Sequence, residues 1–385
     1  MKRIAVVTAT RAEYWLLYPV IRAMRKDESA VRTELIVTGT HLSEDYGMTV
    51  REIEESGVRI EKRIGIPTAS GCAADISGDQ AETLIRFTEL FDKEKYDAVM
   101  LLGDRYELLA IAIAAGNTRT PIFHLCGGDT TEGAMDEWIR HSVTKMSYLH
   151  FVMNEDSRKR VIQMGEDPER VFNYGSTGVD NALYLADLSK KEALESIGLP
   201  DSDYAICTYH PVTLGDENPD ELIEEFLEAL KAFPEIMFIV TMANADHGGK
   251  RINELLREAE PKMRNMRLYS SLGAKRYLSL VKHSLFVLGN SSSGIIEAPV
   301  FHVPTVNIGE RQRGRLRAES VIDSGTGSGN IVSAIRQALS RGFRESCSHT
   351  ENPYGDGHAA EKIAGRSIAT VLEEKIDLKK VFFDL

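Results

Sequence analysis

An acidic stretch that ends in an arginine is the first part of the sequence that could do acid–base chemistry. Asp129, Glu132 and Asp136 follow a short apolar run, and Arg140 lies one helical turn after Asp136. Carboxylates in a partly dry site acquire different pKa values, so that one can act as an acid and another as a base. Asp104 ends another apolar run and is expected nearby. Helix capping by Asp129 and Asp136 is the alternative interpretation.

A second chemical signal is the segment Leu288-Gly-Asn-Ser-Ser-Ser-Gly-Ile-Ile-Glu297, in which an apolar run leads through Gly and Ser into a helical pattern. Backbone N–H groups and the hydroxyls of Ser291 and Ser292 would face a phosphate at the helix start. Glu297, one turn on, could accept two hydroxyls of a ribose. The GxxxxGK[ST] pattern of a P-loop is absent. Capping of the helix by the serines, with no ligand, is the alternative.

Three arginines, Arg311, Arg313 and Arg315, lie within five residues farther along the chain. Such a run is usually a solvated basic face, but here it is a local exception in a chain of net charge −12. The forked guanidinium group suits phosphate oxygens. Together with the serine-rich segment, the run predicts a nucleoside diphosphate as the ligand.

Further polar residues follow apolar runs in both halves of the chain, and each of them alone could be a cap or a turn residue. In doubly wound sheets, ligands bind beyond the carboxyl ends of the strands. The recurrence of these residues at such positions therefore favours a ligand cleft between two domains. The residues are Arg11, His41, Asp104, Arg105 and His210.

The elements that must position these residues alternate between short β-branched runs and amphipathic helical patterns, which is typical of parallel βαβ units. We expect an α/β fold with two Rossmann-like doubly wound domains. The strands are expected at 3–8, 34–38, 97–102, 121–125, 149–153, 204–208, 237–241 and 285–288, and helices at 12–24, 190–197, 219–232, 249–258 and 358–375. The predicted domains are 1–180 and 181–365, and the helix and tail at 366–385 could pack back on the first domain.

Composition excludes several classes of function. The 46 basic against 58 acidic residues give −12, which argues against an extended nucleic-acid surface. No apolar run approaches the roughly 18 residues of a membrane span, and four scattered cysteines favour a reduced, cytoplasmic setting. Metal-binding, nucleophile-elbow and dinucleotide motifs are missing, so we expect no metal and no cofactor.

Six segments in order resemble the UDP-N-acetylglucosamine 2-epimerases, specifically the hydrolysing branch that feeds sialic acid synthesis. The resemblance runs from about residue 1 to residue 365 and implies a glycosyltransferase-B arrangement with the active site between the domains. It also implies elimination of UDP to a 2-acetamidoglucal, followed by addition of water to give N-acetylmannosamine. The segments are Ala9-Thr-Arg-Ala-Glu-Tyr14, Val37-Thr-Gly-Thr-His-Leu42, Gly103-Asp-Arg105, Ile139-Arg-His141, Gly289 to Glu297 and Asn307-Ile-Gly-Glu-Arg-Gln312.

The resemblance also implies a role for each matching residue. The diphosphate would be held by Arg11, Arg105, Ser291, Ser292 and Arg311, with Glu297 on the ribose, His210 beside the phosphates, and Asn244 and Lys250 on the nucleotide side. Asp104 and Asp136 match acid–base carboxylates, Arg140 and His41 match further polar wall residues, and His124 begins a strand-end motif. A nucleotide sugar is the expected partner, without nucleic acid or membrane, and a homo-oligomer is left open.

One position departs from the family pattern. Many relatives carry a catalytic Glu where this chain has Cys126, and a thiol replaces a carboxylate poorly at neutral pH unless its pKa is depressed. Asp129 or Glu132 could take over, or Asp104 and Asp136 could suffice. The change could also accompany another substrate, a UDP- or GDP-linked 2,4-diacetamido-trideoxy sugar or GDP-N-acetylglucosamine. A glycosyltransferase and a catalytically silent nucleotide-sugar sensor are the other hypotheses.

Overall fold

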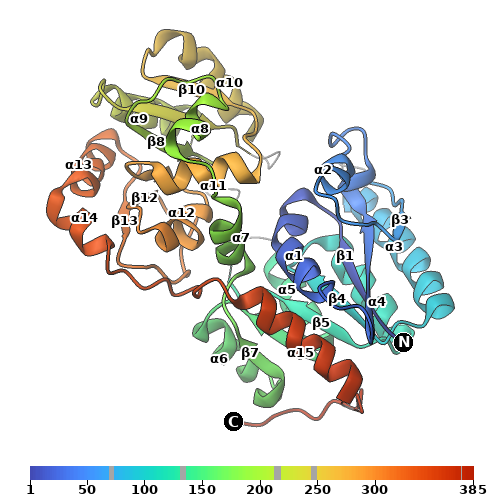
Figure 1. Ribbon diagram of the computed structural model, residues 1–385. Helices are drawn as coiled ribbons and strands as arrows, with labels where there is room; N and C mark the ends of the chain where they lie inside the picture. The colour runs from blue at the N-terminus through green and yellow to red at the C-terminus, as the bar shows by residue number, and fades with distance from the viewer. Residues whose placement is uncertain (69–72, 131–135, 212–217, 244–248, 374) are drawn as a thin grey trace. The chain divides into compact units, whose positions relative to one another are not determined.

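The computed structural model describes the 385 residues apart from 69–72, 131–135, 212–217, 244–248 and 374. It confirms the predicted α/β class, because the chain forms two parallel sheets of seven and six strands (Figure 1). Unit 1 comprises Met1–Thr130, Met135–Asp180 and Gly357–Leu385, and unit 2 comprises Asn181–Asp356. The last helix, α15 (Ala359–Glu373), therefore lies wholly in unit 1.

The sheet of unit 1 has the strand order β3-β2-β1-β4-β5-β6-β7, with every neighbouring pair parallel. The order reverses between β1 and β4, so the sheet is doubly wound about that pair. The strands are β1 (Lys2–Thr8), β2 (Val31–Thr38), β3 (Lys62–Ile64), β4 (Ala98–Leu102), β5 (Ile122–Leu125), β6 (Leu149–Val152) and β7 (Val171–Asn173).

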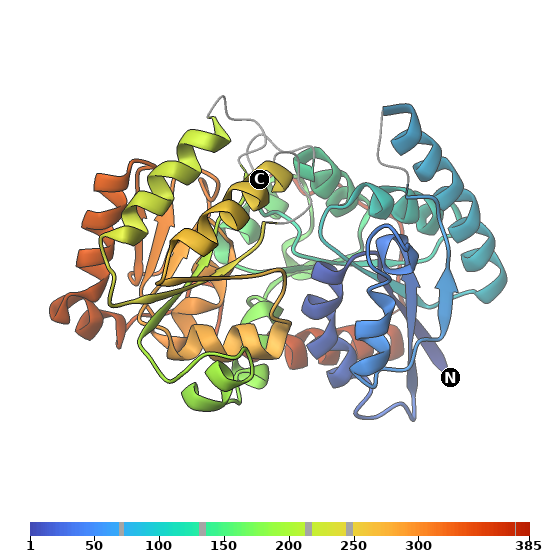
Figure 2. The same ribbon diagram turned by 90° about the horizontal axis from the view of Figure 1, so that it is seen from above.

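Helices cover both faces of this sheet, since alternate residues of each central strand are apolar on opposite sides. Ile4 and Val6 pack in the core with α1 (Arg11–Met24) and α15. Ala5 and Val7 pack in the core with α3 (Ala73–Glu94), α4 (Tyr106–Asn117) and α5 (Asp136–Met146). Helix α15 lies beside α1 (Figure 1), and α3 lies along α4 (Figure 2). The shorter elements are η1 (Gly39–Leu42), α2 (Val50–Glu55), α6 (Glu155–Gln163) and η2 (Pro168–Arg170).

The sheet of unit 2 has the order β10-β9-β8-β11-β12-β13, again parallel, and reverses between β8 and β11. Its strands are β8 (Tyr204–Thr208), β9 (Met237–Thr241), β10 (Met266–Tyr269), β11 (Val287–Gly289), β12 (Thr305–Ile308) and β13 (Val321–Ser324). Its helices are α8 (Lys190–Glu195), α9 (Pro219–Lys231), α10 (Gly249–Ala259), η3 (Glu260–Lys262), α11 (Ala274–His283), α12 (Ser293–Ile296), η4 (Ala298–Phe301), α13 (Ser328–Leu339) and α14 (Arg341–Cys347), with α7 (Thr177–Leu185) leading into the unit.

The core of unit 2 repeats the two-sided pattern. Residues of α9, α10 and α13 pack with one face of the sheet, and residues of α8 and α11 pack with the other. Gly289 ends β11 at φ +130°, where an added Cβ would lie 2.0 Å from the carbonyl oxygen of Thr208. A glycine is therefore required for the close approach of β11 to β8, which brings the ends of these two strands together.

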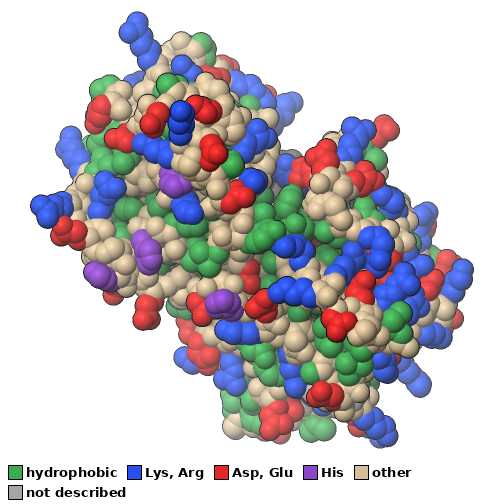
Figure 3. Space-filling model, in the orientation of Figure 1, with side chains coloured by type: hydrophobic (Ala, Val, Ile, Leu, Met, Phe, Trp, Pro, Cys, Tyr) green, Lys and Arg blue, Asp and Glu red, His purple; other side chains and the backbone are tan. Residues whose placement is uncertain are grey.

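Most predicted elements coincide with observed ones, and the strands 204–208 and 237–241 have the predicted bounds. The strand predicted at 285–288 is shifted, since β11 spans Val287–Gly289. Among the described residues, no helix combines the length and apolarity that crossing a bilayer requires. Acidic and basic side chains are interspersed over the face shown in Figure 3, so on that face the negative charge is spread out.

Candidate functional site

The two places where strand order reverses carry most of the predicted site residues. In unit 1, Arg11 follows β1 and both Asp104 and Arg105 follow β4, the two strands that flank the reversal. In unit 2, His210 follows β8 and Ser291 follows β11, which flank the second reversal. Ligands of doubly wound sheets bind at such switch points. Each unit therefore has its own candidate cluster at the carboxyl edge of its sheet.

The acidic cluster of unit 1 is organised around Arg140. This side chain is only 4% exposed, and its Nη2 donates to Oδ2 of Asp104. Its Nη1 lies 2.8 Å from both the backbone carbonyl of Asp129 and Oε2 of Glu137. Desolvation alone would lower the pKa of Arg140, but the charges of Asp104, Asp129 and Glu137 outweigh it and raise that pKa. Arg140 thus stays charged and joins the Asp104 carboxylate after β4, the Asp129 backbone after β5 and the Glu137 carboxylate of α5.

Asp104 is the member of this cluster best placed to meet a ligand. Its side chain remains 26% exposed, although it accepts a hydrogen bond from the buried guanidinium. A carboxylate fixed by an arginine at one oxygen and open to solvent at its other side can still take a proton from a bound molecule. Asp136, at the first position of α5, and Asp129, which is 7% exposed, belong to the same end of the unit.

Two histidines on this side have structural contacts on both ring nitrogens. His124 is fully buried, with Nε2 2.8 Å from the carbonyl oxygen of Gly103 and Nδ1 3.2 Å from Oγ1 of Thr144. Because a carbonyl only accepts, Nε2 carries the proton. Burial lowers the pKa of His124 to about 3, so the ring is neutral and ties the turn after β4 to α5.

His41 is likewise fully buried and joins three segments of unit 1. Its Nε2 lies 3.0 Å from Oγ1 of Thr8, and its Nδ1 lies 2.8 Å from Oγ1 of Thr49. Burial lowers the pKa of His41 to about 4. The turn that carries it begins at Gly39, where φ is +59° and a Cβ would lie 2.7 Å from the Ala9 carbonyl oxygen. The structure places His41 against the end of β1, where both of its ring nitrogens are hydrogen-bonded to threonine hydroxyls.

The turn after β1 is closed by a capping box. Thr10 caps α1 by accepting from the backbone N–H of Glu13, and the Glu13 carboxylate accepts in return from the N–H groups of Ala9 and Thr10. Arg11 projects from the first position of this helix, 47% exposed and 3.8 Å from Glu52. Arg105, 40% exposed, is the N-cap residue of α4 and follows β4, the strand next to β1. Both arginines are open enough to contact an anion.

In unit 2, Asn290 is the residue that holds the cluster together, a role that its local sequence does not reveal. It is 1% exposed, and its side chain bonds both the backbone N–H and the carbonyl of His210 at 2.7 and 2.8 Å. Its own carbonyl accepts from Arg311 at 3.1 Å and from Gln312 at 2.8 Å. Desolvation, followed by the charge of Arg311, lowers the pKa of His210 to about 4. One asparagine thus brings His210 and Arg311 to the end of β11.

The serine-rich segment forms a shorter helix than its sequence suggests. Helix α12 has four residues and continues directly into η4, so its dipole is small. Ser292 occupies the N-cap without a side-chain cap bond, and Ser291 accepts a long one of 3.4 Å from the N–H of Ser293. The capping alternative therefore explains little of these serines. Burial raises the pKa of Glu297, whose Oε2 is buried without a hydrogen-bond partner among the described residues.

The remaining predicted residues are exposed or half-buried, or they lie outside the described residues. Lys250 is exposed at the second position of α10. Asn244 and Glu132 lie outside the described residues. Cys126 follows β5 with φ +64°, in the left-handed region, and its side chain is half-buried. Within the described residues, no group of three or more His, Cys, Asp or Glu side chains could hold a metal ion.

Comparisons with known proteins agree with this architecture. The family model for UDP-N-acetylglucosamine 2-epimerase matches residues 22–366. The chain is 37% identical over its whole length to the GDP/UDP-N,N'-diacetylbacillosamine 2-epimerase (hydrolyzing) of Campylobacter jejuni, covering 99% of that protein. It is also 37% identical over its whole length to the polysialic acid biosynthesis protein P7 of Escherichia coli, covering 98% of it.

A solved structure shares the fold. The UDP-GlcNAc 2-epimerase from Neisseria meningitidis bound to UDP-GlcNAc superposes with a TM-score of 0.81, covering 96% of this chain and 100% of that chain at 20% identity. Two doubly wound parallel sheets of this kind define the class as the glycosyltransferase-B-like α/β proteins. Within that class, the chain belongs to the UDP-N-acetylglucosamine 2-epimerase family. It is a nucleotide-sugar 2-epimerase of the hydrolysing type.

Proposed function

We propose that the protein converts a UDP-linked 2-acetamido sugar, with UDP-N-acetylglucosamine as the first candidate, into UDP and the free C2 epimer. The observation that carries the proposal is the cluster around Arg140, in which a buried guanidinium holds the partly exposed carboxylate of Asp104 just after β4. A fixed carboxylate of this kind suits removal of the weakly acidic proton at C2. The family membership and the clusters at both strand reversals support the same reaction class.

In the proposed first step, Asp104 takes the C2 proton, the electron pair forms the C1–C2 double bond, and the C1–O bond breaks to release UDP. The departing diphosphate gains negative charge, which Arg11, Arg105 and Arg311 would stabilise together with Ser291 and Ser292. Glu297 would accept the ribose hydroxyls, and its buried Oε2, which has no hydrogen-bond partner in the described part of the chain, suits that role. His210, with Asn244 and Lys250, would line the nucleotide side.

In the proposed second step, water adds to C1 of the glucal while C2 receives a proton from the opposite face. Asp136 and Asp129 are the described carboxylates we assign to this step, and Glu132 is the third candidate. Cys126 cannot contribute a carboxylate at the position where relatives carry Glu, so the other carboxylates must supply the proton. His41 and Arg140 would act by holding the ends of β1 and β4 in place.

The experiment is incubation with UDP-N-acetylglucosamine in deuterated water, followed by NMR. We expect UDP and N-acetylmannosamine that carries deuterium at C2, because the new C2–H bond takes its hydrogen from solvent. Release of unlabelled N-acetylglucosamine would contradict the elimination step. Product that forms only after an acceptor is added would indicate a glycosyltransferase, and binding without turnover would indicate a sensor.

A second substrate is favoured by the relatives. Proteins 37% and 34% identical to this chain are named for diacetylbacillosamine, the first with GDP or UDP and the second with UDP. A relative named for UDP-N-acetylglucosamine is 32% identical. The same assay with UDP- and GDP-linked 2,4-diacetamido-trideoxy sugars and with GDP-N-acetylglucosamine decides between them, since the preferred substrate has the largest kcat/KM.

A further inference from the structure

Three charged side chains lie at the strand reversal of unit 1, and two of them have no part in the proposed chemistry. Glu13, in the first turn of α1, is 5% exposed, and Glu107, in the first turn of α4, is fully buried. Arg105 lies with them, its Nη2 3.4 Å from Oε1 of Glu107. We name Glu13, Arg105 and Glu107 the switch-point trio. With both carboxylates ionised, the trio carries a net charge of −1 beside a predicted anion site.

Each member of the trio leaves one buried polar atom without a hydrogen-bond partner among the described residues. Glu13 uses a single oxygen, Oε2, to accept from the N–H groups of Ala9 and Thr10 at 2.8 and 3.0 Å. Its other oxygen, Oε1, is buried without a hydrogen-bond partner among the described residues, as are Oε2 of Glu107 and Nε of Arg105. An ionised carboxylate with a buried, unpartnered oxygen is costly, whereas a protonated one loses most of that cost.

Three other charged groups on or next to α1 are paired with carboxylates of other segments. Arg11 lies 3.8 Å from Glu52 of α2, Arg25 pairs with Glu61 at 2.7 Å, and Lys26 pairs with Glu361 of α15 at 2.6 Å. His41 of η1 makes its contacts with threonines. Glu107 and Arg105 of α4 are therefore the charged groups that act on Glu13, the first raising its proton affinity and the second lowering it.

We propose that Glu13 and Glu107 are positioning residues for Arg105, and that Glu13 holds a proton when an anion binds to that arginine. The proton changes the net charge of the trio from −1 to zero, which removes the repulsion that an arriving diphosphate would meet. Glu107 keeps the guanidinium in place through its ion pair. The inference rests on the proposed function, because it requires a nucleotide diphosphate at Arg105.

The test is calorimetry of UDP binding at pH 8 in buffers with different heats of ionisation, which counts the protons taken up. Burial raises the pKa of Glu13 to about 8. In the free protein Glu13 is therefore partly ionised at this pH, and the wild type should take up roughly half a proton per UDP bound. Glu13→Gln, which mimics the protonated form, should remove that uptake, while ionisation of UDP itself contributes equally to both proteins. The affinity of Glu13→Gln for UDP should also fall less between pH 7 and pH 9 than that of the wild type.

Two further variants keep the test decisive. Glu107→Gln removes the neighbouring charge that favours the proton on Glu13, so more of the free variant has Glu13 ionised at pH 8. Because the proposal has Glu13 protonated in the complex, this variant should take up more protons per UDP than the wild type, and it can be measured even if Glu13→Gln does not fold. Glu361→Gln removes a carboxylate that is 62% exposed on α15 and should leave the uptake unchanged. Equal uptake in wild type, Glu13→Gln and Glu107→Gln would overturn the inference while UDP binding stood.

Failure of the proposed function gives different results. If GDP binds and UDP does not, the same proton count is made with GDP, and the inference is judged on that count. If UDP or GDP binds with Glu13-dependent uptake but no sugar is epimerised in the NMR assay, the proposed reaction fails and the inference stands. If neither nucleotide binds, both are overturned.

Discussion

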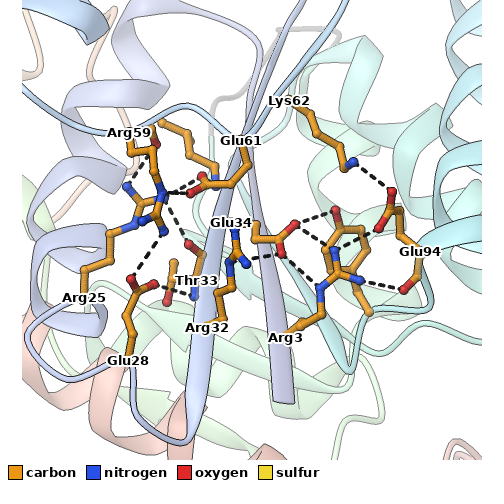
Figure 4. A network of polar contacts seen from close by, with 12 residues as sticks. Arg3, Arg25, Glu28, Arg32, Thr33, Glu34, Arg59, Glu61, Lys62 and Glu94 are labelled. Carbon is orange, nitrogen blue, oxygen red and sulfur yellow. Dashed lines mark hydrogen bonds and ion pairs between the residues drawn. The ribbon is translucent and has the colours of Figure 1, made fainter. Parts of the chain in front are cut away.

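The sheet of unit 1 carries a cluster of buried charges near each of its two ends, and the two clusters differ in how completely their carboxylates are paired. At the amino-terminal end, Arg3 of β1 meets Glu34 of β2 through two parallel hydrogen bonds of 2.9 Å each (Figure 4). Arg3 also contacts Glu94, which pairs with Lys62 at 2.8 Å, and Tyr96 donates to Glu34 at 3.1 Å. Both oxygens of each carboxylate have a partner. We call these five residues the Arg3 network.

The switch-point trio at the carboxyl end of the same sheet has the opposite character. Each of its three members keeps one buried polar atom without a hydrogen-bond partner among the described residues. Desolvation by itself would raise the pKa of Glu34, but the contacts from Arg3 and Tyr96 reverse this and lower it. For Glu13, desolvation prevails and the pKa rises to about 8.

The difference agrees with the proposal that the carboxyl end of this sheet is a ligand site, while the Arg3 network stabilises the fold. Buried polar atoms in native proteins nearly always find partners, so a cluster of exceptions requires a cause. The exceptions in the trio lie at the strand reversal, where ligands of this fold class bind, and strongly perturbed carboxyl groups are typical of functional sites. The Arg3 network lies at the end without such a role and acts as a cross-link between β1, β2 and α3.

The strongest test at the carboxyl end is Asp104→Asn. The amide keeps the shape but cannot take a proton, so we expect turnover to fall by about 10²-fold or more. The measurement is kcat in the NMR assay, with circular dichroism to show that the variant is folded. Asp92→Asn is the matched control, because that carboxylate is 73% exposed on α3. A near-normal rate for Asp104→Asn would remove Asp104 from the mechanism.

The second test asks whether the carboxyl end of unit 2 is also a ligand site. Arg311→Ala removes a guanidinium held by the Asn290 carbonyl at 3.1 Å. We expect UDP affinity to fall by about 30-fold, the scale of one charge-assisted contact, and the Michaelis constant to rise. Calorimetry with UDP measures the change. Arg313→Ala, at a side chain 71% exposed, should have little effect. Equal affinities for the two variants would exclude Arg311 from the phosphate site.

The sequence predicts the fold well because the central strands are buried on both faces and therefore apolar throughout. Strands such as β8 and β9 have the predicted bounds for this reason. Helix α3, with 22 residues, is not predicted, because its charged and small residues obscure the apolar face formed by Phe87, Leu90 and Phe91. Helical periodicity alone is a weak signal when the buried stripe is narrow.

The candidate site is predicted only in part, because some of its residues are brought together by strands that are neighbours in the sheet but distant in the sequence. Asp104, Arg140 and His210 could be found because they follow apolar runs or share a short segment. Glu107 and Asn290 could not, since each resembles an ordinary polar residue at the start of a helix. Their roles depend on strand neighbours: β1 beside β4 places Glu13 near Glu107, and β8 beside β11 places Asn290 against His210. Local sequence patterns do not contain that information.

At the amino-terminal end, Glu34→Gln should affect stability rather than catalysis. The amide leaves Arg3 without its forked partner, and since Arg3 is 27% exposed, we expect a loss of about 1–2 kcal/mol in the free energy of unfolding of unit 1. Both tryptophans, Trp15 and Trp138, lie in unit 1, so their fluorescence during urea unfolding follows this unit. Unchanged stability, or a large loss of kcat in the folded variant, would break the contrast between the two ends.

The last test concerns the pH dependence that Glu13 gives to the same unfolding transition. The pKa of Glu13 is about 8 in the folded chain and near 4.5 when unfolded, so the folded state binds the extra proton between these values. The free energy of unfolding contributed by this group is therefore full below pH 4.5 and declines as the pH rises toward 8. Urea midpoints from tryptophan fluorescence at pH 5, 6, 7 and 8 should fall less steeply for Glu13→Gln than for the wild type or for Glu361→Gln. Parallel curves for all three proteins would mean that Glu13 is ionised in the fold, and that the trio is as fully compensated as the Arg3 network.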